Sequence, residues 1–202
     1  MAADPLALDK VVDLVLECMC SALTATAEAV DGQPGCPCLA CKVPGSLTTW
    51  TCDPEPLPGQ DCAPGQLAVR VARLFPSTTF PGQDLGADGC APSTIVAEIV
   101  VLLLRCMPVV SDQETDCLPT CDQLAAAARV QHIDMLTIFR AATCCVPFAP
   151  TLGGRKRRRV AISSHRAVGP EERCVGSELT LLVDLGNPCG CDPDLPTPDP
   201  SV

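Results

Sequence analysis

Cysteine is the residue type with the most chemical potential in this chain, which has sixteen cysteines among 202 residues. Cysteine thiolates can attack substrates, bind metals or oxidise to disulfides. A cysteine nucleophile needs a base close by, and the only histidines, His132 and His165, stand in no recognisable catalytic sequence. These observations argue against a cysteine nucleophile, and we expect His132 on a helix surface and His165 at the end of a strand.

A cluster of cysteines early in the chain offers two kinds of chemistry. Cys36, Cys38, Cys41 and Cys52 can hold zinc as four thiolates, although their C-x-C-x2-C spacing differs from the paired spacing of zinc ribbons. Disulfides are favoured, because the cysteine total is even and the other cysteines are scattered along the chain. We expect no cofactor, with zinc as the less favoured alternative. The candidate disulfide cysteines are Cys36, Cys38, Cys41, Cys52, Cys62, Cys90, Cys117, Cys121, Cys144, Cys145, Cys174, Cys189 and Cys191.

Spacing limits some of these bridges but does not fix their connectivity. Cys117 and Cys121 are close enough in sequence to bond each other locally. Adjacent Cys144 and Cys145 cannot easily bond each other. We therefore expect each of these two to reach a different segment and to tie the end of a helix to the sheet or the loop.

The composition describes a globular chain without a membrane span. Apolar residues make up 47% of the sequence, and the net charge of -10 argues against a general nucleic-acid binder. The longest apolar run, Ile95 to Leu104, is interrupted by Glu98 and is shorter than the roughly 20 residues that cross a bilayer. The first residues lack a charged-plus-apolar leader, so we expect synthesis where thiols stay reduced and oxidation later.

Two segments show the three-to-four spacing of amphipathic helices. The first follows Asp4 and Pro5, which predict an N-cap and a proline in the first helical position, and it is expected to end near Gly32. The second follows Thr120, where Gln123 completes a capping box. Both helices need a sheet on which to bury their apolar sides.

Strands are predicted in the rest of the chain. Residues 33–65 are crowded with proline, glycine and cysteine, which predicts a cysteine-pinned loop with at most one short strand at Leu47–Thr51. Elsewhere, alternating or β-branched residues predict four strands. Thr94–Cys106 is apolar on both faces and is expected at the centre of the sheet, and the last two strands form a hairpin. The four strands are Leu67–Phe75, Thr94–Cys106, Arg158–His165 and Cys174–Leu185.

This order predicts an α+β fold, a single antiparallel sheet packed against two helices with cysteine-rich loops, in the order α-β-β-β-α-β-β. Residues 1–185 are expected to form one domain, with residues 33–65 as its cysteine-rich loop insertion. Residues 186–202 contain five prolines and three aspartates and are expected to form an extended tail.

The same blocks resemble a known family. The opening helix, the strand Leu67–Phe75 running into Pro76, the strand Thr94–Cys106, the capped helix from Thr120 and the terminal hairpin are similar to the tail terminators of long-tailed phages, the lambda minor tail protein U group. Strings such as Cys36-Pro37-Cys38 and Cys174-Val175-Gly176 also resemble tail proteins from phages of actinobacteria. The lambda-type pattern has neither this cysteine content nor the tail after Gly186.

The resemblance implies a structural role in a virion with no substrate turned over, so we expect the chain not to be an enzyme. A terminator forms a homo-hexameric ring that ends the tail tube and provides the surface that joins the head, so its partners are further copies of itself, the tail tube protein and a head-completion or stopper protein. Such a protein is assembled in the host bacterial cytoplasm and works at the head-proximal end of the tail, with no membrane partner. Another head-tail connector, a stopper or adaptor, is the alternative, followed by a zinc-binding interaction module.

One run of basic residues stands out in this acidic chain. It comprises Arg155, Lys156, Arg157, Arg158 and Arg159. The run can be a solvated hairpin edge, or it can face genomic DNA in the lumen of a ring or an acidic neighbouring subunit. We expect the acidic tail to pair with this run on an adjacent subunit. We also expect most of the sixteen cysteines to be reduced in fresh protein and oxidised in the mature particle.

Overall fold

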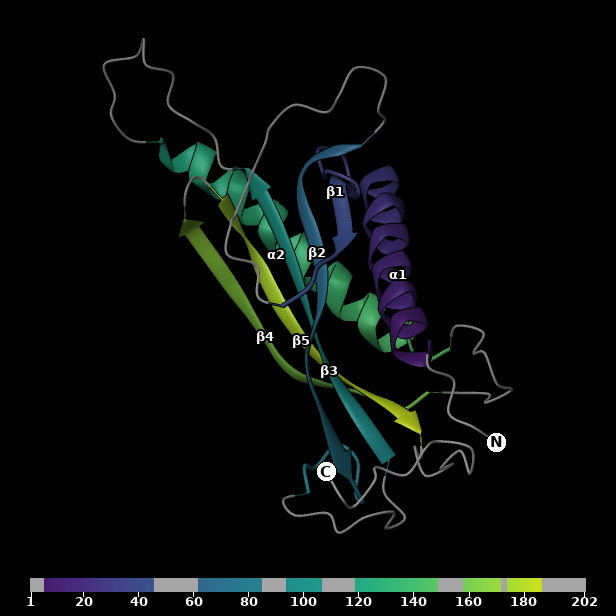
Figure 1. The fold of residues 1–202 in the computed structure, drawn as a ribbon. Helices are drawn as coiled ribbons and strands as arrows, with labels where there is room; N and C mark the ends of the chain where they lie inside the picture. Colours follow the sequence, from purple (N-terminus) through teal and green to yellow (C-terminus); the bar gives the residue numbers. More distant parts are fainter. Residues whose placement is uncertain are drawn as a thin grey trace, which may run out of the picture.

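The computed structural model describes residues 6–45, 62–84, 94–106, 119–148, 158–171 and 174–186. The elements follow in the predicted order, helix, three strands, helix and two strands (Figure 1). The chain has the predicted α+β class. The elements are α1 (Ala7–Ala29), β1 (Pro37–Lys42), β2 (Ala63–Ser77), β3 (Thr94–Cys106), α2 (Cys121–Cys144), β4 (Val160–Glu171) and β5 (Cys174–Gly186).

The five strands form one sheet in the order β1-β2-β3-β5-β4. β3 lies at the centre, as its continuous apolar sequence predicts, and pairs antiparallel with β2 and β5. β4 and β5 form the predicted antiparallel hairpin. β1 and β2, however, run parallel, so the sheet is mixed and the expectation of a purely antiparallel sheet is wrong. A disulfide between Cys38, at the start of β1, and Cys62, just before β2, makes both strands begin at the same end.

β1 lies inside the stretch that the sequence predicts to be a loop. Its six residues, Pro37–Lys42, show no alternation of apolar and polar types, which is the signal that marks a strand in a sequence. The short strand expected at Leu47–Thr51 falls outside the described residues. The prediction of a loop over residues 33–65 is therefore wrong for β1, and also for the first residues of β2, which begins at Ala63.

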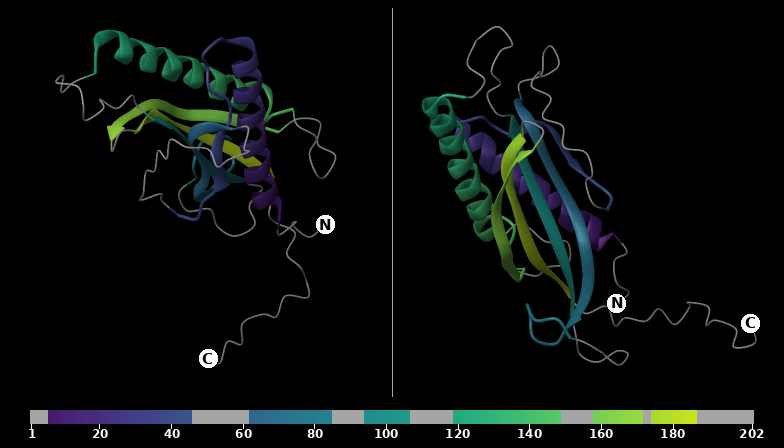
Figure 2. Two further views of the ribbon diagram at one scale, coloured as in Figure 1. Left: turned by 90° about the horizontal axis from the view of Figure 1, so that it is seen from above. Right: turned by 90° about the vertical axis from the view of Figure 1, so that its left-hand side faces the viewer.

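Both helices cover the same face of the sheet (Figure 2). α1 packs over β1 and β2, while α2 packs over β5 and β4. The apolar stripe of α1 reaches full burial at Val15, Met19 and Leu23, and it meets the inward residues of β2, β3 and β5. The core therefore consists of aliphatic side chains that alternate along the strands and recur every three or four residues along the helices.

The two helices begin differently. α2 has the predicted capping box, in which Thr120 accepts from the Gln123 backbone N–H and the Gln123 side chain accepts from the Thr120 N–H. α1 begins at Ala7 after Leu6, which provides no side-chain cap. The predicted N-cap at Asp4 is therefore wrong. In the described part of the chain, neither helix is long and apolar enough to cross a membrane.

Candidate functional site

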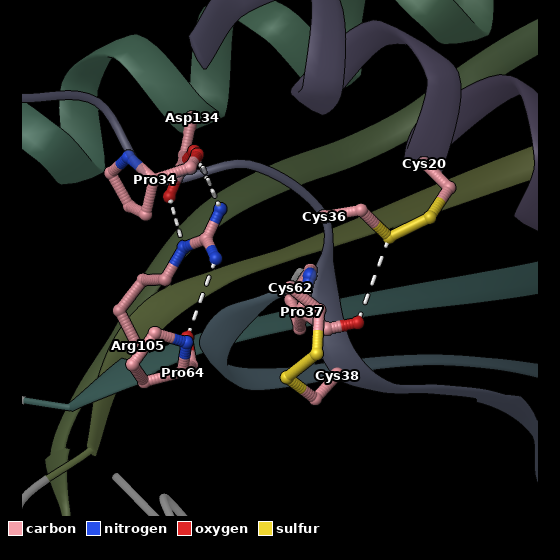
Figure 3. The surroundings of a disulfide bond; sticks show 9 residues. All are labelled: Cys20, Pro34, Cys36, Pro37, Cys38, Cys62, Pro64, Arg105 and Asp134. Carbon is pink, nitrogen blue, oxygen red and sulfur yellow. Dashed lines mark hydrogen bonds and ion pairs between the residues drawn. A yellow bond between two sulfur atoms is a disulfide. The ribbon is translucent and has the colours of Figure 1, made fainter. Parts of the chain in front are cut away.

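Two disulfides fix β1 in place (Figure 3). Cys20 of α1 bonds Cys36, which immediately precedes β1, and Cys38 of β1 bonds Cys62, which immediately precedes β2. The strand is thus tied to the helix beneath it and to its neighbour in the sheet. Cys36 and Cys38 are used in separate bridges here, so they are not available as a pair of thiolate zinc ligands in this structure. Among the residues described, no group of three potential metal ligands occurs.

A third disulfide ties the two helices together. Cys18 of α1 bonds Cys145, the C-cap residue of α2, across a sequence separation of 127 residues. Cys174, the first residue of β5, is also disulfide-bonded. Cys18 and Cys20 were not among the predicted disulfide cysteines. Cys18 and Cys20 are two positions apart, and residues at that spacing point in nearly opposite directions around a helix, so this pair can serve two different elements.

The structure confirms some of the predicted disulfide cysteines and contradicts others. Cys36, Cys38, Cys62, Cys145 and Cys174 are oxidised. Three other candidates carry free thiols, namely Cys41, Cys121 and Cys144.

The free thiols of Cys121 and Cys144 contradict two of the predicted bridges. The local bridge between Cys117 and Cys121 is not formed, because Cys121 is exposed at the start of α2 as a free thiol. Of the adjacent pair, only Cys145 is bridged, because Cys145 faces α1 while Cys144 is exposed to solvent. The remaining candidates lie outside the described residues, and they are Cys52, Cys90, Cys117, Cys189, Cys191, Arg155, Lys156 and Arg157.

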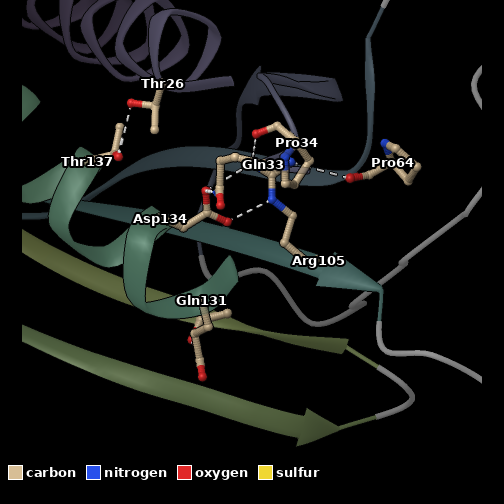
Figure 4. Close-up of polar contacts among 9 residues, drawn as sticks. Thr26, Gln33, Pro34, Pro64, Arg105, Gln131, Asp134 and Thr137 are labelled. Atoms are coloured by element: carbon tan, nitrogen blue, oxygen red, sulfur yellow. Dashed lines mark hydrogen bonds and ion pairs between the residues drawn. The ribbon is translucent and has the colours of Figure 1, made fainter. Parts of the chain in front are cut away.

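A buried polar network lies beside the disulfides of β1 (Figures 3 and 4). Arg105, near the end of β3, forms a two-pronged ion pair with Asp134 of α2, with Nε–Oδ2 and Nη2–Oδ1 distances of 2.9 and 3.2 Å. Gln33 donates to the same carboxylate, and Arg105 also donates to the carbonyl oxygens of Pro34 and Pro64. The network joins the segment before β1 to β2, β3 and α2, so it is a structural tie.

The predictions from the sequence do not include this network, although the sequence contains a signal for it. Arg105 is a charge within an otherwise apolar strand, and Asp134 lies four residues before the buried Ile138 on the same side of α2. A buried charge needs a partner of opposite sign. Applied to Arg105 and Asp134, which have opposite charges, this rule indicates that the two side chains contact each other.

Arg159 is one of the two residues of the basic run that the structure describes, and an ion pair holds its side chain. Its guanidinium bonds Asp184 of β5, with an Nε–Oδ2 distance of 2.7 Å, and lies 5.2 Å from the centre of the Phe80 ring. Burial alone raises the pKa of Asp184, but hydrogen bonds from Thr94, from the Gly186 N–H and from Arg159, with the charge of Arg159, outweigh burial and lower that pKa below its usual value. The Arg159 side chain is 57% exposed, so one side of it remains open to solvent.

A cavity of about 610 Å³ lies next to this ion pair. Its size falls within the usual range of ligand pockets. It is formed where the end of α2, the start of β4 and the turn after β2 meet. The described residues that line it are Phe80, Ala142, Thr143, Pro147, Arg158, Arg159, Val160 and Ile162.

The side of the molecule formed by α1 and β1 is acidic. Asp9, Asp13 and Glu17 are exposed on α1 at four-residue spacing. Lys42 of β1 bonds both aspartates at 2.8 Å, and hydrogen bonds first from Asp13 and then from Asp9 raise its pKa. Leu39 on β1 is 45% exposed. We call this surface, made of Asp9, Asp13, Glu17, Leu39 and Lys42, the acidic side.

The opposite side, formed by α2 and β4, is basic and partly apolar. Leu136 and Phe139 of α2 are 58% and 41% exposed, and Arg140 next to them is also exposed. On β4, Arg166 is exposed and bonds Glu178 of the neighbouring strand. We call this surface the basic side, and its members are Leu136, Phe139, Arg140, Arg158, Arg159 and Arg166.

The two histidines lie on different elements, His132 on α2 and His165 on β4. His132 is exposed on α2, as predicted. His165 lies within β4, not at its end, because the strand continues to Glu171. Its ring stacks on Phe139 with 6.3 Å between ring centres, and burial lowers its pKa.

The described residues therefore present two sides of opposite charge, held by a sheet with disulfide ties, and a cavity at the basic side. Comparison of the chain with protein-family models and with curated proteins finds no match.

Proposed function

We propose that this chain is a structural virion protein that forms a ring at the end of a phage tail tube and provides the surface for joining the head. The observation that supports it is the opposite charge of the two lateral sides. In a ring, each copy contacts its neighbours through two different surfaces. The acidic side of one copy and the basic side of the next suit such a contact.

The sheet edges support the same proposal. β1 and β4 are the outermost strands, so each presents one row of backbone groups without a strand partner in this sheet. β1 lies on the acidic side and β4 on the basic side. Contact between the two sides therefore also brings two strand edges together, with exposed Leu39 near one edge and Leu136 and Phe139 near the other.

The ties within the domain suit a ring subunit. The disulfides hold α1 to β1 and to the end of α2, so covalent bonds limit the movement of α1 and β1 relative to the end of α2. Ring closure depends on a constant angle between successive copies, which a rigid subunit provides.

Charge reversal tests the proposed contact. Glu17→Arg on the acidic side and Arg140→Glu on the basic side should each reduce ring formation, because each places like charges at the contact. The double variant should recover rings, since it restores opposite charges. Negative-stain electron microscopy and light scattering of the full chain measure the rings, and microscopy of tails locates them at the head-proximal end.

Glu28→Arg is the matched control, because it makes the same charge change at an exposed position near the C-terminal end of α1, away from Asp9, Asp13 and Glu17. It should leave ring formation unchanged. A chain that stays monomeric at all concentrations and has no position in tails contradicts the proposal. Rings that form equally well in both single variants contradict this particular contact.

A further inference from the structure

The cavity on the basic side combines apolar walls with two cationic side chains. Pro147, Val160 and Ile162 provide apolar surface, and Phe80 provides an aromatic face. Arg158 adds positive charge, and Arg159, although it is paired with Asp184, keeps an exposed side. Aromatic-lined grooves bind extended proline-rich segments, because such segments are already ordered and expose their ring faces. Guanidinium groups select carboxylates. The cavity is therefore suited to an acidic, proline-rich peptide.

The chain itself contains a segment of this composition. Residues 187–202 include the run Asp192-Pro193-Asp194-Leu195-Pro196 and, after it, Pro198, Asp199 and Pro200. The segment has no basic residue. Because proline and aspartate alternate in this segment, its proline rings can pack on the apolar wall of the cavity while its carboxylates pair with the arginine side chains.

The end of β5 lies close to a residue that lines the cavity. Asp184 bonds Arg159, which lines the cavity, and the backbone N–H of Gly186, the last residue of β5, bonds the other oxygen of Asp184 at 2.8 Å. Gly186, the last residue described before 187–202, is therefore connected to the lining residue Arg159 by two hydrogen bonds through Asp184, and residues 187–202 can span about 50 Å when extended. Such a short connection keeps a segment at an effective concentration in the millimolar range at its own binding site.

We propose that the cavity bordered by Phe80, Thr143, Arg158 and Arg159 binds residues 187–202 of the same chain. This differs from the expectation that the tail lies on an adjacent subunit, and it follows from the position at which β5 ends. The contact does not depend on ring formation, so it can hold whether or not the chain assembles.

Photo-crosslinking in the full-length protein tests the proposal. Benzoylphenylalanine replaces Thr143, an exposed residue at the border of the cavity, and mass spectrometry maps the cross-linked peptides. The expected product joins position 143 to residues 187–202. A benzoylphenylalanine at Leu124, exposed near the other end of α2, is the matched control and should not give this product. Thermal melting of each variant checks that the fold is retained.

Two further measurements test the chemistry and the origin of the segment. Replacing Asp192, Asp194 and Asp199 together by Asn should reduce the cross-linking yield several-fold, as should 1 M salt, because both weaken the contact with arginine. The second measurement mixes isotopically light and heavy proteins before assembly. A cross-link within one chain joins two peptides with the same label, so only light–light and heavy–heavy products are expected.

Other results overturn the proposal. Products that map to other segments, or a yield that the three substitutions leave unchanged, show that the cavity does not bind the acidic segment. Mixed light–heavy products overturn the same-chain assignment and assign the cavity to the tail of a neighbour. Loss of rings in the charge-reversal variants does not affect these outcomes, so the two proposals can fail separately.

Discussion

Arg105 and Asp134 form an ion pair in which both side chains are almost fully buried, at 7% and 3% exposure. The pair connects the central strand to the middle of α2, and each partner has further hydrogen bonds. Removing one partner leaves a charge in a low-dielectric environment, whereas removing both leaves none. The two kinds of variant should therefore behave differently.

The first prediction is that Arg105→Met lowers the free energy of unfolding by about 3–5 kcal/mol, because it leaves the Asp134 carboxylate unpaired. The double variant Arg105→Met, Asp134→Leu should be more stable than Arg105→Met alone. Urea unfolding followed by circular dichroism measures both. The control is Arg73→Met, since the Arg73–Glu98 pair is 53% and 20% exposed and its loss should cost less than about 1 kcal/mol. An equal loss in the single and double variants would contradict a role for the unpaired charge.

The second prediction concerns the disulfide between Cys18 and Cys145. In the loop-entropy account, a bridge across 127 residues stabilises by about 5 kcal/mol, and the bridge across 16 residues between Cys20 and Cys36 by about 3 kcal/mol. Replacing both members of the first pair by alanine should therefore cost more than replacing both members of the second. Unfolding in urea under non-reducing conditions gives the two values. The reverse order would show that local geometry, not loop length, determines the effect.

The third prediction is that the native protein has reactive thiols at Cys121 and Cys144, which are exposed, and a slower one at Cys41, which is half-buried. A maleimide label mapped by mass spectrometry distinguishes them from the bridged cysteines. Cys18, Cys20, Cys36 and Cys38 should react only after reduction. Labelling of these four in the unreduced native protein would show that the bridges are absent.

Local patterns account for the parts of the fold that the sequence predicts. The capping box at Thr120 and Gln123 locates the start of α2, because all of its contacts lie within three residues of chain. β3 is predicted with its exact bounds, since a long β-branched and apolar segment has few other options in a small domain. Element order follows from such local signals.

Contacts between distant residues account for what the sequence does not predict. The direction of β1 depends on the bond between Cys38 and Cys62, and no local pattern specifies that pairing. Cys18 and Cys20 pair with residues on different elements, which depends on how α1 lies on the sheet. The two charged sides likewise appear only when α1 and β1 are placed at one edge of the sheet and α2 and β4 at the other.

The fourth prediction is that Gly176→Ala severely destabilises the protein. Gly176 lies opposite Leu104 in the pairing of β3 and β5, and an added Cβ would overlap the backbone oxygen of Leu103. The neighbour is backbone at the centre of the sheet, so it cannot move aside as a flexible side chain can. Gly35→Ala is the control, because its Cβ would meet only ordinary contacts of 3.7 and 3.9 Å. Melting temperatures of the two variants should differ clearly, and similar values would contradict the close approach.

The fifth prediction concerns pH and His165. Burial lowers the pKa of His165 in the folded protein below the ordinary value of 6.5, and among the described residues its Nε2 atom has no hydrogen-bond partner. The unfolded chain therefore binds a proton at His165 more readily than the folded chain. It follows that the stability contributed by the neutral ring is complete above pH 6.5 and is lost as the pH falls through 6.5 towards the lower folded pKa.

Urea unfolding of the full chain at several pH values between 7.5 and 5 measures this loss. His165→Gln removes the titrating group from beside Phe139, so this variant should lose less stability over the same pH range than the parent protein. His132→Gln, at an exposed position of α2, should keep the pH dependence of the parent. If the parent and His165→Gln lose equal stability between these pH values, then His165 does not couple protonation to unfolding, and other groups account for the dependence.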